Sequence, residues 1–325
     1  MNCDYPLRFK PILRRYLWGG RRLETVLGKP LPPGNDYAES WELVDHGADQ
    51  SVVRSGPLGG ATLHELVCRH GPALLGRHAP QPQFPLLFKF LDAQKYLSVQ
   101  VHPNDEQAAC LSPPDHGKTE AWVVLHAEPG SRIYAGLKPG VDRTTLRDAI
   151  AAGTAEQCLH GVQPSVGDCL LIPAGTVHAL GAGLVIAEIQ QSSDTTYRLY
   201  DWNRVGPDGQ PRRLHVEEAL AVIDFEAGPV SPRSAESASA GHVQRLVTCD
   251  KFVVDRRQLD APHSIAGDQR CHLLVPLQGS LNVERDAAPA ALRPGQTSLV
   301  PAAAGPLRVS PRDSATLLDI YLPLP

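Results

Sequence analysis

The sequence predicts a mainly β protein with two β-barrel domains and a few helices around them. Its 30 Pro and 28 Gly residues divide the 325-residue chain into short segments, as in folds whose strands are joined by tight turns. Several segments alternate polar and apolar residues, which is the period of a strand with one packed face. The pattern of residues 164–173 returns at residues 294–301, which favours a second barrel related to the first.

Residues 1–225 are expected to form the larger domain, with helical decorations. Short strands and turns fill residues 5–60, and residues 41–44 are one expected strand. Three segments have helical periodicity instead, and these are residues 63–75, 142–153 and 215–224. Asp142 is placed to cap the second helix, and Gly153 follows its end.

Residues 226–241 are rich in Ala, Ser, Pro and Gly, which predicts a linker to a second domain over residues 242–325. This domain contains strand-like runs at residues 252–255, 272–275, 279–284 and 316–322. In the first domain, His178 follows Pro173 by five residues. In the related segment of the second domain, the residue five positions after Pro301 is Pro306. We therefore expect a degenerate barrel without a metal site, which packs against or shapes the first.

The composition narrows the functional classes. The net charge of −4 predicts no general surface for nucleic acid, although a local basic pocket for one phosphate is permitted. The seven cysteines are scattered without a Cys-x-x-Cys motif, which favours a reduced cytoplasmic protein. No apolar run has transmembrane length, and the first residues lack the pattern of a signal peptide. The oligomeric state leaves no sign in the sequence.

Residues 167–178 contain the most informative motif. A turn at Gly167, a short apolar strand at residues 169–172 and a second turn at residues 173–175 place His178 at a fixed distance from the strand. The spacing Gly-x5-Pro-x-Gly-x2-His resembles the second motif of the cupin (jelly-roll) barrels. That resemblance implies two cupin-like barrels in the chain, with the histidine as a metal ligand in the first.

Candidate partners for His178 lie upstream on alternating segments. Gln100 and His102 share a face of the segment 95–102, and Glu120 lies on the next one. Two imidazoles, a carboxylate and an amide oxygen suit Zn²⁺, and they would also accept Mn, Co or Fe. A single histidine on a strand is more often an ordinary hydrogen-bonded residue, but the four residues together predict a metal site.

These segments resemble type I mannose-6-phosphate isomerase (phosphomannose isomerase) in its short bacterial form. The resemblance runs over about residues 5–225, in the segments 16–20, 38–42, 84–91, 99–105, 117–122 and 196–204. It implies reversible, zinc-dependent interconversion of mannose 6-phosphate and fructose 6-phosphate, and hence a small phosphorylated sugar as the partner.

The resemblance also implies which residues act. The positions that match Lys89, Lys118, Glu188 and Arg198 line the family's active site, and the arginine is held to be essential there. An aldose–ketose isomerisation needs a base for a carbon-bound proton, stabilisation of an enediolate and a hold on the phosphate. Ser98 shares the face of Gln100 and could bond the sugar or the phosphate. Together with Lys118 and Arg198 from the resemblance, it is an expected substrate-binding residue.

Three other functions remain open at this stage. Two histidines and a carboxylate would also serve an Fe(II) dioxygenase. A barrel that binds a sugar phosphate without turnover would be a sensor. The same site could also isomerise other phosphorylated sugars.

Overall fold

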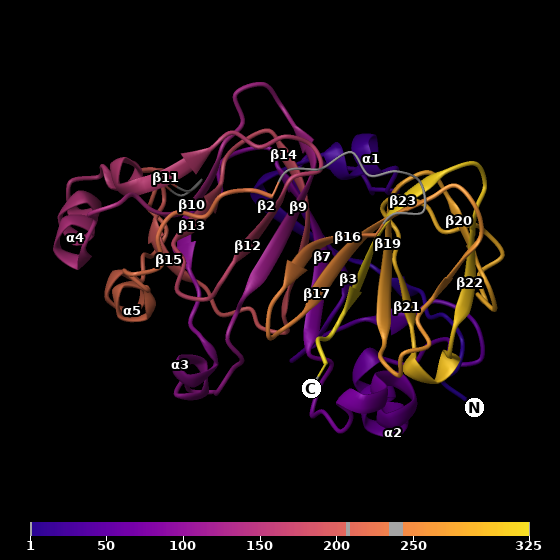
Figure 1. Ribbon diagram of the computed structural model, residues 1–325. Coiled ribbons are helices and arrows are strands. Elements are labelled where there is room, and N and C mark those ends of the chain that lie inside the picture. The colour runs from indigo at the N-terminus through magenta and orange to yellow at the C-terminus, as the bar shows by residue number, and fades with distance from the viewer. Residues whose placement is uncertain (1, 206–208, 234–242, 325) are drawn as a thin grey trace.

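The computed structural model describes residues 2–205, 209–233 and 243–324. Its main sheets are stacked as four successive β layers, seen from left to right in Figure 1. The prediction of a mainly β protein is confirmed. No sheet among these residues closes on itself, so the layers form sandwiches and the two cupin-like barrels remain a prediction.

The first two layers hold most of residues 1–225. Layer 1 has five strands, ordered β11 (Leu159–Val162), β10 (Ile133–Leu137), β13 (His178–Leu180), β8 (Val99–Val101) and β15 (Tyr197–Tyr200). Layer 2 has six strands, ordered β12 (Cys169–Ile172), β9 (Glu120–Ala127), β14 (Leu184–Gln191), β7 (Leu86–Ala93), β3 (Tyr37–Leu43) and β2 (Ile12–Gly20). Apolar side chains from both layers, among them Trp122 and Leu180, fill the space between them.

The other two layers come from the C-terminal part of the chain. Layer 3 has the order β16 (Val243–Thr248), β17 (Val253–Leu259), β23 (Ala315–Tyr321), β19 (His272–Gln278) and β21 (Ser298–Val300). Layer 4 has the order β18 (His263–Ile265), β22 (Leu307–Pro311) and β20 (Leu281–Val283). Two small ribbons pair β1 (Phe9–Lys10) with β6 (Val52–Val53) and β4 (Asp45–His46) with β5 (Asp49–Gln50).

Layer 2 is covered on both faces, because layer 1 packs on one side and layer 3 on the other. The largest apolar cluster joins layer 2 residues such as Phe90 to layer 3 residues such as Leu273 and Leu318. All eight residues of β7 and of β14 are therefore buried, including the charged Lys89 and Glu188. Burial of a charge is costly unless it is paired, so such residues are candidates for function.

The expected helices are confirmed. They are α2 (Leu63–Leu75), α4 (Arg143–Ala151) and α5 (Val216–Val222), joined by α1 (Arg22–Leu27), α3 (Asp105–Ala109) and the 3₁₀ turns Gly76–His78, Ala155–Cys158 and Ala302–Ala304. A reciprocal capping box between Thr62 and Glu65 begins α2, and the Asp142 side chain caps α4 as predicted. None of the helices in the described ranges is long and apolar enough to cross a membrane.

Some expected element bounds are wrong. The strand expected over residues 95–102 is only β8, and His102 follows its end. The strand expected over residues 279–284 is shortened to β20, because Gly279 has a left-handed φ of +73° in the preceding turn. Residues 226–233 of the expected linker pack on the first part of the chain, where Val230 N donates to Ala135 O. The remainder of that linker lies outside the described residues.

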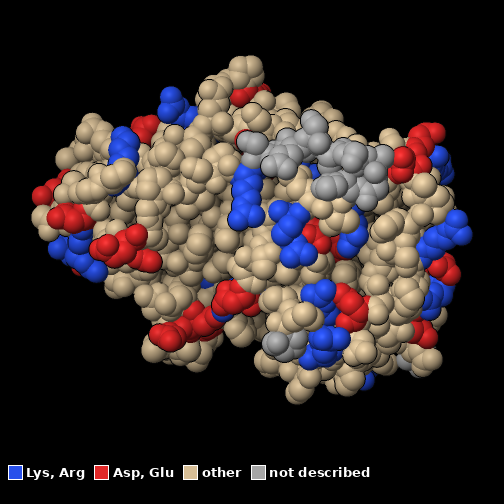
Figure 2. Space-filling model, viewed as in Figure 1, with Lys and Arg blue, Asp and Glu red and all other residues tan. Residues whose placement is uncertain are grey.

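The charged side chains on the face shown in Figure 2 are intermixed, with Lys and Arg beside Asp and Glu. The expected absence of a nucleic-acid partner stays a prediction. The cytoplasmic location stays a prediction.

Candidate active site

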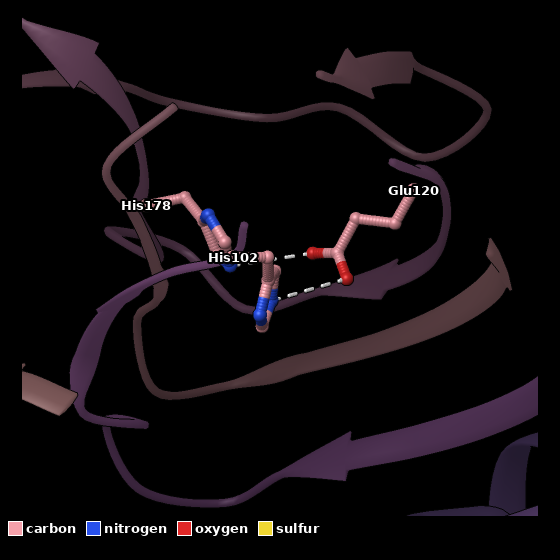
Figure 3. Close-up of side chains that lie close together, drawn as sticks. All are labelled: His102, Glu120 and His178. Atoms are coloured by element: carbon pink, nitrogen blue, oxygen red, sulfur yellow. Dashed lines mark ion pairs between the residues drawn. The ribbon is translucent and has the colours of Figure 1, made fainter. Parts of the chain in front are cut away.

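Three of the four predicted metal ligands form one cluster between layers 1 and 2. Their ligand atoms lie within 4.8 Å of one another (Figure 3). His102 Nε2 is 3.5 Å from Glu120 Oε2, and His178 Nε2 is 3.3 Å from Glu120 Oε1. All three side chains are buried. The turn at residues 173–175 and the β13 strand bring His178 here, as the motif predicts.

The two imidazoles are oriented for metal binding. Nδ1 of His102 lies 2.9 Å from the carbonyl oxygen of Thr195, and Nδ1 of His178 lies 2.9 Å from that of Thr176. A carbonyl oxygen only accepts hydrogen bonds, so each Nδ1 carries the proton and each Nε2 keeps its lone pair. Burial lowers the pKa of both imidazoles, that of His102 well below its usual range, which favours their neutral, ligating form.

The donor set fits a divalent cation. Glu120 Oε1 is buried and has no hydrogen-bond donor, a costly arrangement for a carboxylate oxygen that has no other partner. Gln100 lies opposite His178 in the β8–β13 pair, and its amide nitrogen is 3.2 Å from His178 Nε2. The amide oxygen and nitrogen exchange places by a simple flip, so Gln100 can offer an oxygen at the same position. One carboxylate and two neutral imidazoles suit Zn²⁺ and other divalent transition metals.

Lys118 connects this cluster to the adjoining pocket. Its Nζ donates to Glu120 Oε2 and lies 3.1 Å from His102 Nε2 and 3.8 Å from Glu188 Oε1. Lys118 precedes strand β9 and is not part of it, although its side chain shares the side of Glu120 as expected. The Lys118 side chain is buried, so water screens its interactions with these neighbouring groups only weakly.

A second buried ion pair forms the floor of the pocket. Lys89 on β7 is directly opposite Glu188 on β14, and its Nζ lies 3.1 Å from Glu188 Oε1. Burial alone would lower the pKa of Lys89, but Glu188 and Glu39 raise it above its usual value. Burial opposes ionisation of Glu188, yet Lys89 and Lys118 lower its pKa below the usual range. Both groups are therefore charged at neutral pH.

The four predicted catalytic residues all line one cavity of about 260 Å³, together with Ser98 and Gln100. The four are Arg198, Lys118, Lys89 and Glu188. Ser98 is buried beside them, just before β8. The structure thus brings together every residue that the sequence proposed for catalysis or substrate binding.

The sequence analysis proposed no site role for the other lining residues, which are Tyr16, Trp18, Glu39, Trp41, Leu91, Leu97, Trp122, Leu180, Asp194, Thr196 and Arg212. Trp41 and Glu39 belong to a segment that the sequence marked as family-like without giving either a role. Trp41 donates through its indole nitrogen to Glu39 Oε2, and this fixes the carboxylate 3.7 Å from Lys89. Arg212 lies outside every recognisable motif, so no sequence signal could identify it.

Two arginines at the cavity differ in their bonding. Arg212 is held by Asp201, with its Nε 2.7 Å from Asp201 Oδ2. Arg198 donates from Nη1 to the carbonyl oxygen of Arg213 at 3.0 Å, while its buried Nε has no partner. Burial lowers the pKa of Arg198, and Arg212 adds to this. Arg198 therefore retains a free donor and forms no ion pair with a carboxylate of the described residues, and it is the better anchor for an anion.

Cys169 on β12 is no candidate nucleophile. Its side chain is buried, and burial raises the pKa of its thiol to about 12. The thiolate is thereby disfavoured, and Cys169 is a packed thiol of the core.

Comparisons with known proteins point in the same direction. The family "Phosphomannose isomerase type I, catalytic domain" matches residues 7–120. The mannose-6-phosphate isomerase ManA of Bacillus subtilis is 35% identical over 281 residues, which cover 84% of this chain and 86% of that protein. The mannose-6-phosphate isomerase of Streptococcus mutans is 34% identical over 91% of this chain and 92% of its own length. The crystal structure of the Bacillus subtilis mannose 6-phosphate isomerase superposes with a TM-score of 0.88 at 28% identity, covering 98% of this chain and 100% of that one.

Proposed function

The chain belongs to the type I mannose-6-phosphate isomerase family, and we propose that it interconverts mannose 6-phosphate and fructose 6-phosphate. The observation that carries the proposal is the single cavity in which an ionised carboxylate, two lysines and an arginine with a free donor meet beside a His–Glu–His cluster. These are the groups that proton transfer next to a carbonyl and recognition of a phosphate require.

One divalent ion completes the site in this proposal. His102, Glu120 and His178 would hold it, with Gln100 as the fourth ligand, and zinc is the ion we propose. When bound, the metal supplies Lewis-acid polarisation of the sugar carbonyl and its neighbouring hydroxyl.

The phosphate is assigned to Arg198. Its unpartnered Nε and its position in the cavity allow a charge-assisted hydrogen bond to a phosphate oxygen. Ser98 and Lys118 are buried in the lining of the same cavity and would bond the sugar oxygens. Holding the substrate at both ends fixes the carbon atoms that exchange the proton.

Glu188 is the proposed base. In the forward direction its carboxylate removes the proton from C2 of open-chain mannose 6-phosphate and returns it to C1, while a second proton moves from O2 to O1. The product is fructose 6-phosphate, and no other reactant is consumed. Lys89 and Lys118 lie 3.1 and 3.8 Å from Glu188 Oε1 and would stabilise the negative charge of the enediolate.

A coupled assay tests the function. Purified protein is given mannose 6-phosphate, and formation of fructose 6-phosphate is followed before chelation, after chelation and after zinc is restored. We expect turnover that is lost with the chelator and regained with zinc. Folded, metal-loaded protein without turnover would refute the isomerase, and turnover that survives complete metal removal would refute the metal requirement.

A further inference from the structure

A second and larger cavity lies away from the active site, where the N-terminal segment meets the C-terminal part of the chain. This basic pocket has a volume of about 680 Å³. It is lined by residues 8–11, 27–30, Glu42, Arg54 and the turn 293–297. The volume is within the range of about 300–1,000 Å³ that small-molecule sites occupy. None of its lining residues also lines the catalytic cavity.

The lining has a strong excess of positive charge. Five basic residues line it against one acidic residue, Glu42, in a chain whose net charge is −4. The five are Arg8, Lys10, Lys29, Arg54 and Arg293. Like charges gathered in a concave site raise the local concentration of anions and repel one another until an anion binds.

Two of these cations are already neutralised and form the floor. Lys29 is buried and donates to Glu42 Oε1 at 2.7 Å, and Arg8 is paired with Asp286 at 2.6 Å. The other three, Lys10, Arg54 and Arg293, are exposed, and none of the carboxylates in the described part of the chain pairs with them. The three unpaired cations come from distant parts of the sequence, so the fold has gathered them at one rim.

The rim is held in place by contacts between the two parts of the chain. Lys29 Nζ also donates to the carbonyl oxygen of Gly295 at 2.6 Å. Gly295 has a φ of +77°, and a Cβ atom there would lie 2.5 Å from the carbonyl oxygen of Leu27. Only glycine permits so close an approach, and the turn that carries Arg293 is thereby fixed beside the floor.

The rest of the lining combines the polar residues Gln296 and Thr297 with apolar residues, several of them stiff prolines. Phe9, Pro11, Pro30 and Pro294 line the pocket beside the cations. A bare inorganic anion would leave these surfaces without a partner, whereas a ring attached to a phosphate would cover them. We propose that the basic pocket binds a small phosphate monoester that carries a sugar or nucleoside ring.

The position of the pocket separates it from catalysis. Strand β3 runs between the two cavities, with Trp41 lining the catalytic cavity and Glu42 lining the basic pocket. Ser40 Oγ donates to Glu42 Oε1 at 2.6 Å, so Ser40 and Glu42 share the face of β3 opposite to that of Trp41. The two ligands would therefore bind on opposite sides of layer 2. Substitutions of the rim arginines should therefore leave isomerase activity unchanged.

The test is isothermal titration of the full-length protein at low ionic strength with adenosine 5′-monophosphate (AMP), ribose 5-phosphate and inorganic phosphate. Arg54→Gln and Arg293→Gln remove one rim charge each, from different parts of the chain. Arg312→Gln is the matched control, because Arg312 is an exposed arginine of the C-terminal part outside the pocket. Steady-state kinetics on mannose 6-phosphate accompany each titration.

We expect each rim substitution to weaken binding of AMP or ribose 5-phosphate about tenfold, as loss of one charge-assisted hydrogen bond does, with unchanged kcat/KM. The Kd of the Arg312→Gln control for either compound should stay within about twofold of that of the parent protein. Tighter binding of ribose 5-phosphate would identify a sugar phosphate, and tighter binding of AMP a nucleotide. The proposal is overturned if neither compound binds, if the rim variants bind like the control, or if inorganic phosphate binds as tightly as both.

Discussion

Arg198 and Arg212 lie at the same cavity but are not equivalent residues. Arg212 pairs with Asp201, which also pairs with Arg204, whereas the Nε of Arg198 is buried without a partner. Arg198→Ala should lower kcat/KM for mannose 6-phosphate on the order of 100-fold, through a charge-assisted contact to the phosphate, while the metal content stays unchanged. Arg212→Ala is the comparison, and it should lower kcat/KM much less than Arg198→Ala does. Steady-state kinetics with metal analysis check this, and loss of metal from the Arg198 variant would contradict its role.

His178 is predicted to be a metal ligand, since its Nε2 faces Glu120 and its Nδ1 is bonded to the main chain. His178→Ala should bind less than one tenth of the zinc of the parent protein, because one ligand costs roughly this much affinity or more. His263→Ala is the control, as His263 is exposed on β18. Metal analysis after dialysis is the measurement. A His178 variant that retained a full equivalent of zinc would remove this residue from the site.

Much of the site could be predicted at the residue scale, because its key residues stand in short motifs. The spacing before His178 and the pair Lys118 and Glu120 are local features of the sequence, and the structure places these residues together. Arg212 could not be found in this way. Its place in the cavity depends on its pairing with Asp201, and a contact of this kind is set by the tertiary fold.

At the scale of single elements, helix α2 has the clearest local cause. Thr62 accepts from the backbone N–H of Glu65, and the Glu65 side chain accepts from the backbone of Thr62. Thr62→Ala should lower the free energy of unfolding by about 1 kcal/mol, because it leaves helix N–H groups without an acceptor. Thr62→Ser keeps the hydroxyl, and because Ser caps a helix at least as well as Thr, it should leave the free energy of unfolding nearly unchanged. Urea denaturation measures both, and equal losses would contradict the cap.

Strand β19 carries a buried histidine between two carboxylates. His272 Nδ1 is 2.7 Å from Asp319 Oδ1 and its Nε2 is 3.1 Å from Asp268 Oδ1. Burial lowers the pKa of His272, but these carboxylates outweigh burial and raise it from 6.5 to about 9. A raised pKa stabilises the folded state below pH 6.5, and this contribution is lost as the pH rises through about 9.

The free energy of unfolding should therefore fall on the order of 1–3 kcal/mol between pH 6.5 and pH 9.5. The upper value applies if the pKa of His272 is 6.5 in the unfolded state and about 9 in the folded state. Arg257 and Arg270 contact the same carboxylates and reduce the effect. His272→Gln should flatten this slope, whereas His263→Gln should not. Denaturation at several pH values is the measurement, and an unchanged slope in His272→Gln would refute the assignment.

Element bounds were predictable where local signals were strong and failed where they were weak. Caps and turn glycines mark the ends of α2 and α4, and so their bounds could be read from the sequence. The β8 strand is shorter than its alternating pattern, because pairing with β13 and β15 extends over only a few residues. A pattern of alternation describes which residues could form a strand, but the partner strands decide how many do.

At the scale of the whole molecule, the sequence predicted that the C-terminal part packs against the first, but it did not indicate which strands form the contact between layers 2 and 3. The two domains and their linker stay a prediction, and the largest apolar cluster contains residues from both parts of the chain. Leu7 also pairs with Leu299 of β21, so the N-terminal segment contacts the C-terminal sheet. Apolar strands such as β7 indicate burial without indicating what covers them, and the covering layer comes from residues far away in the sequence.

This stacking predicts that the molecule unfolds as one cooperative unit. Adjacent residues of β23 provide the test, since Leu318 belongs to the cluster shared with layer 2 and Leu317 to the cluster shared with layer 4. Both are buried, and Leu→Ala at either position should cost about 2–5 kcal/mol. The four tryptophans, Trp18, Trp41, Trp122 and Trp202, all lie before residue 226 and report on the other half of the molecule.

If unfolding is cooperative, Leu317→Ala must lower the Tm reported by tryptophan fluorescence as much as the calorimetric Tm. This is a strict test, because the apolar cluster that contains Leu317 includes no residue of layers 1 and 2. Leu318→Ala should do the same, because it also loosens the direct contact. Independent domains would give a different result, in which Leu317→Ala shifts a calorimetric transition while the fluorescence Tm stays at the value of the parent protein. Because the shared cluster extends over both halves, separating them would expose its whole apolar surface to water, and we therefore expect the single transition.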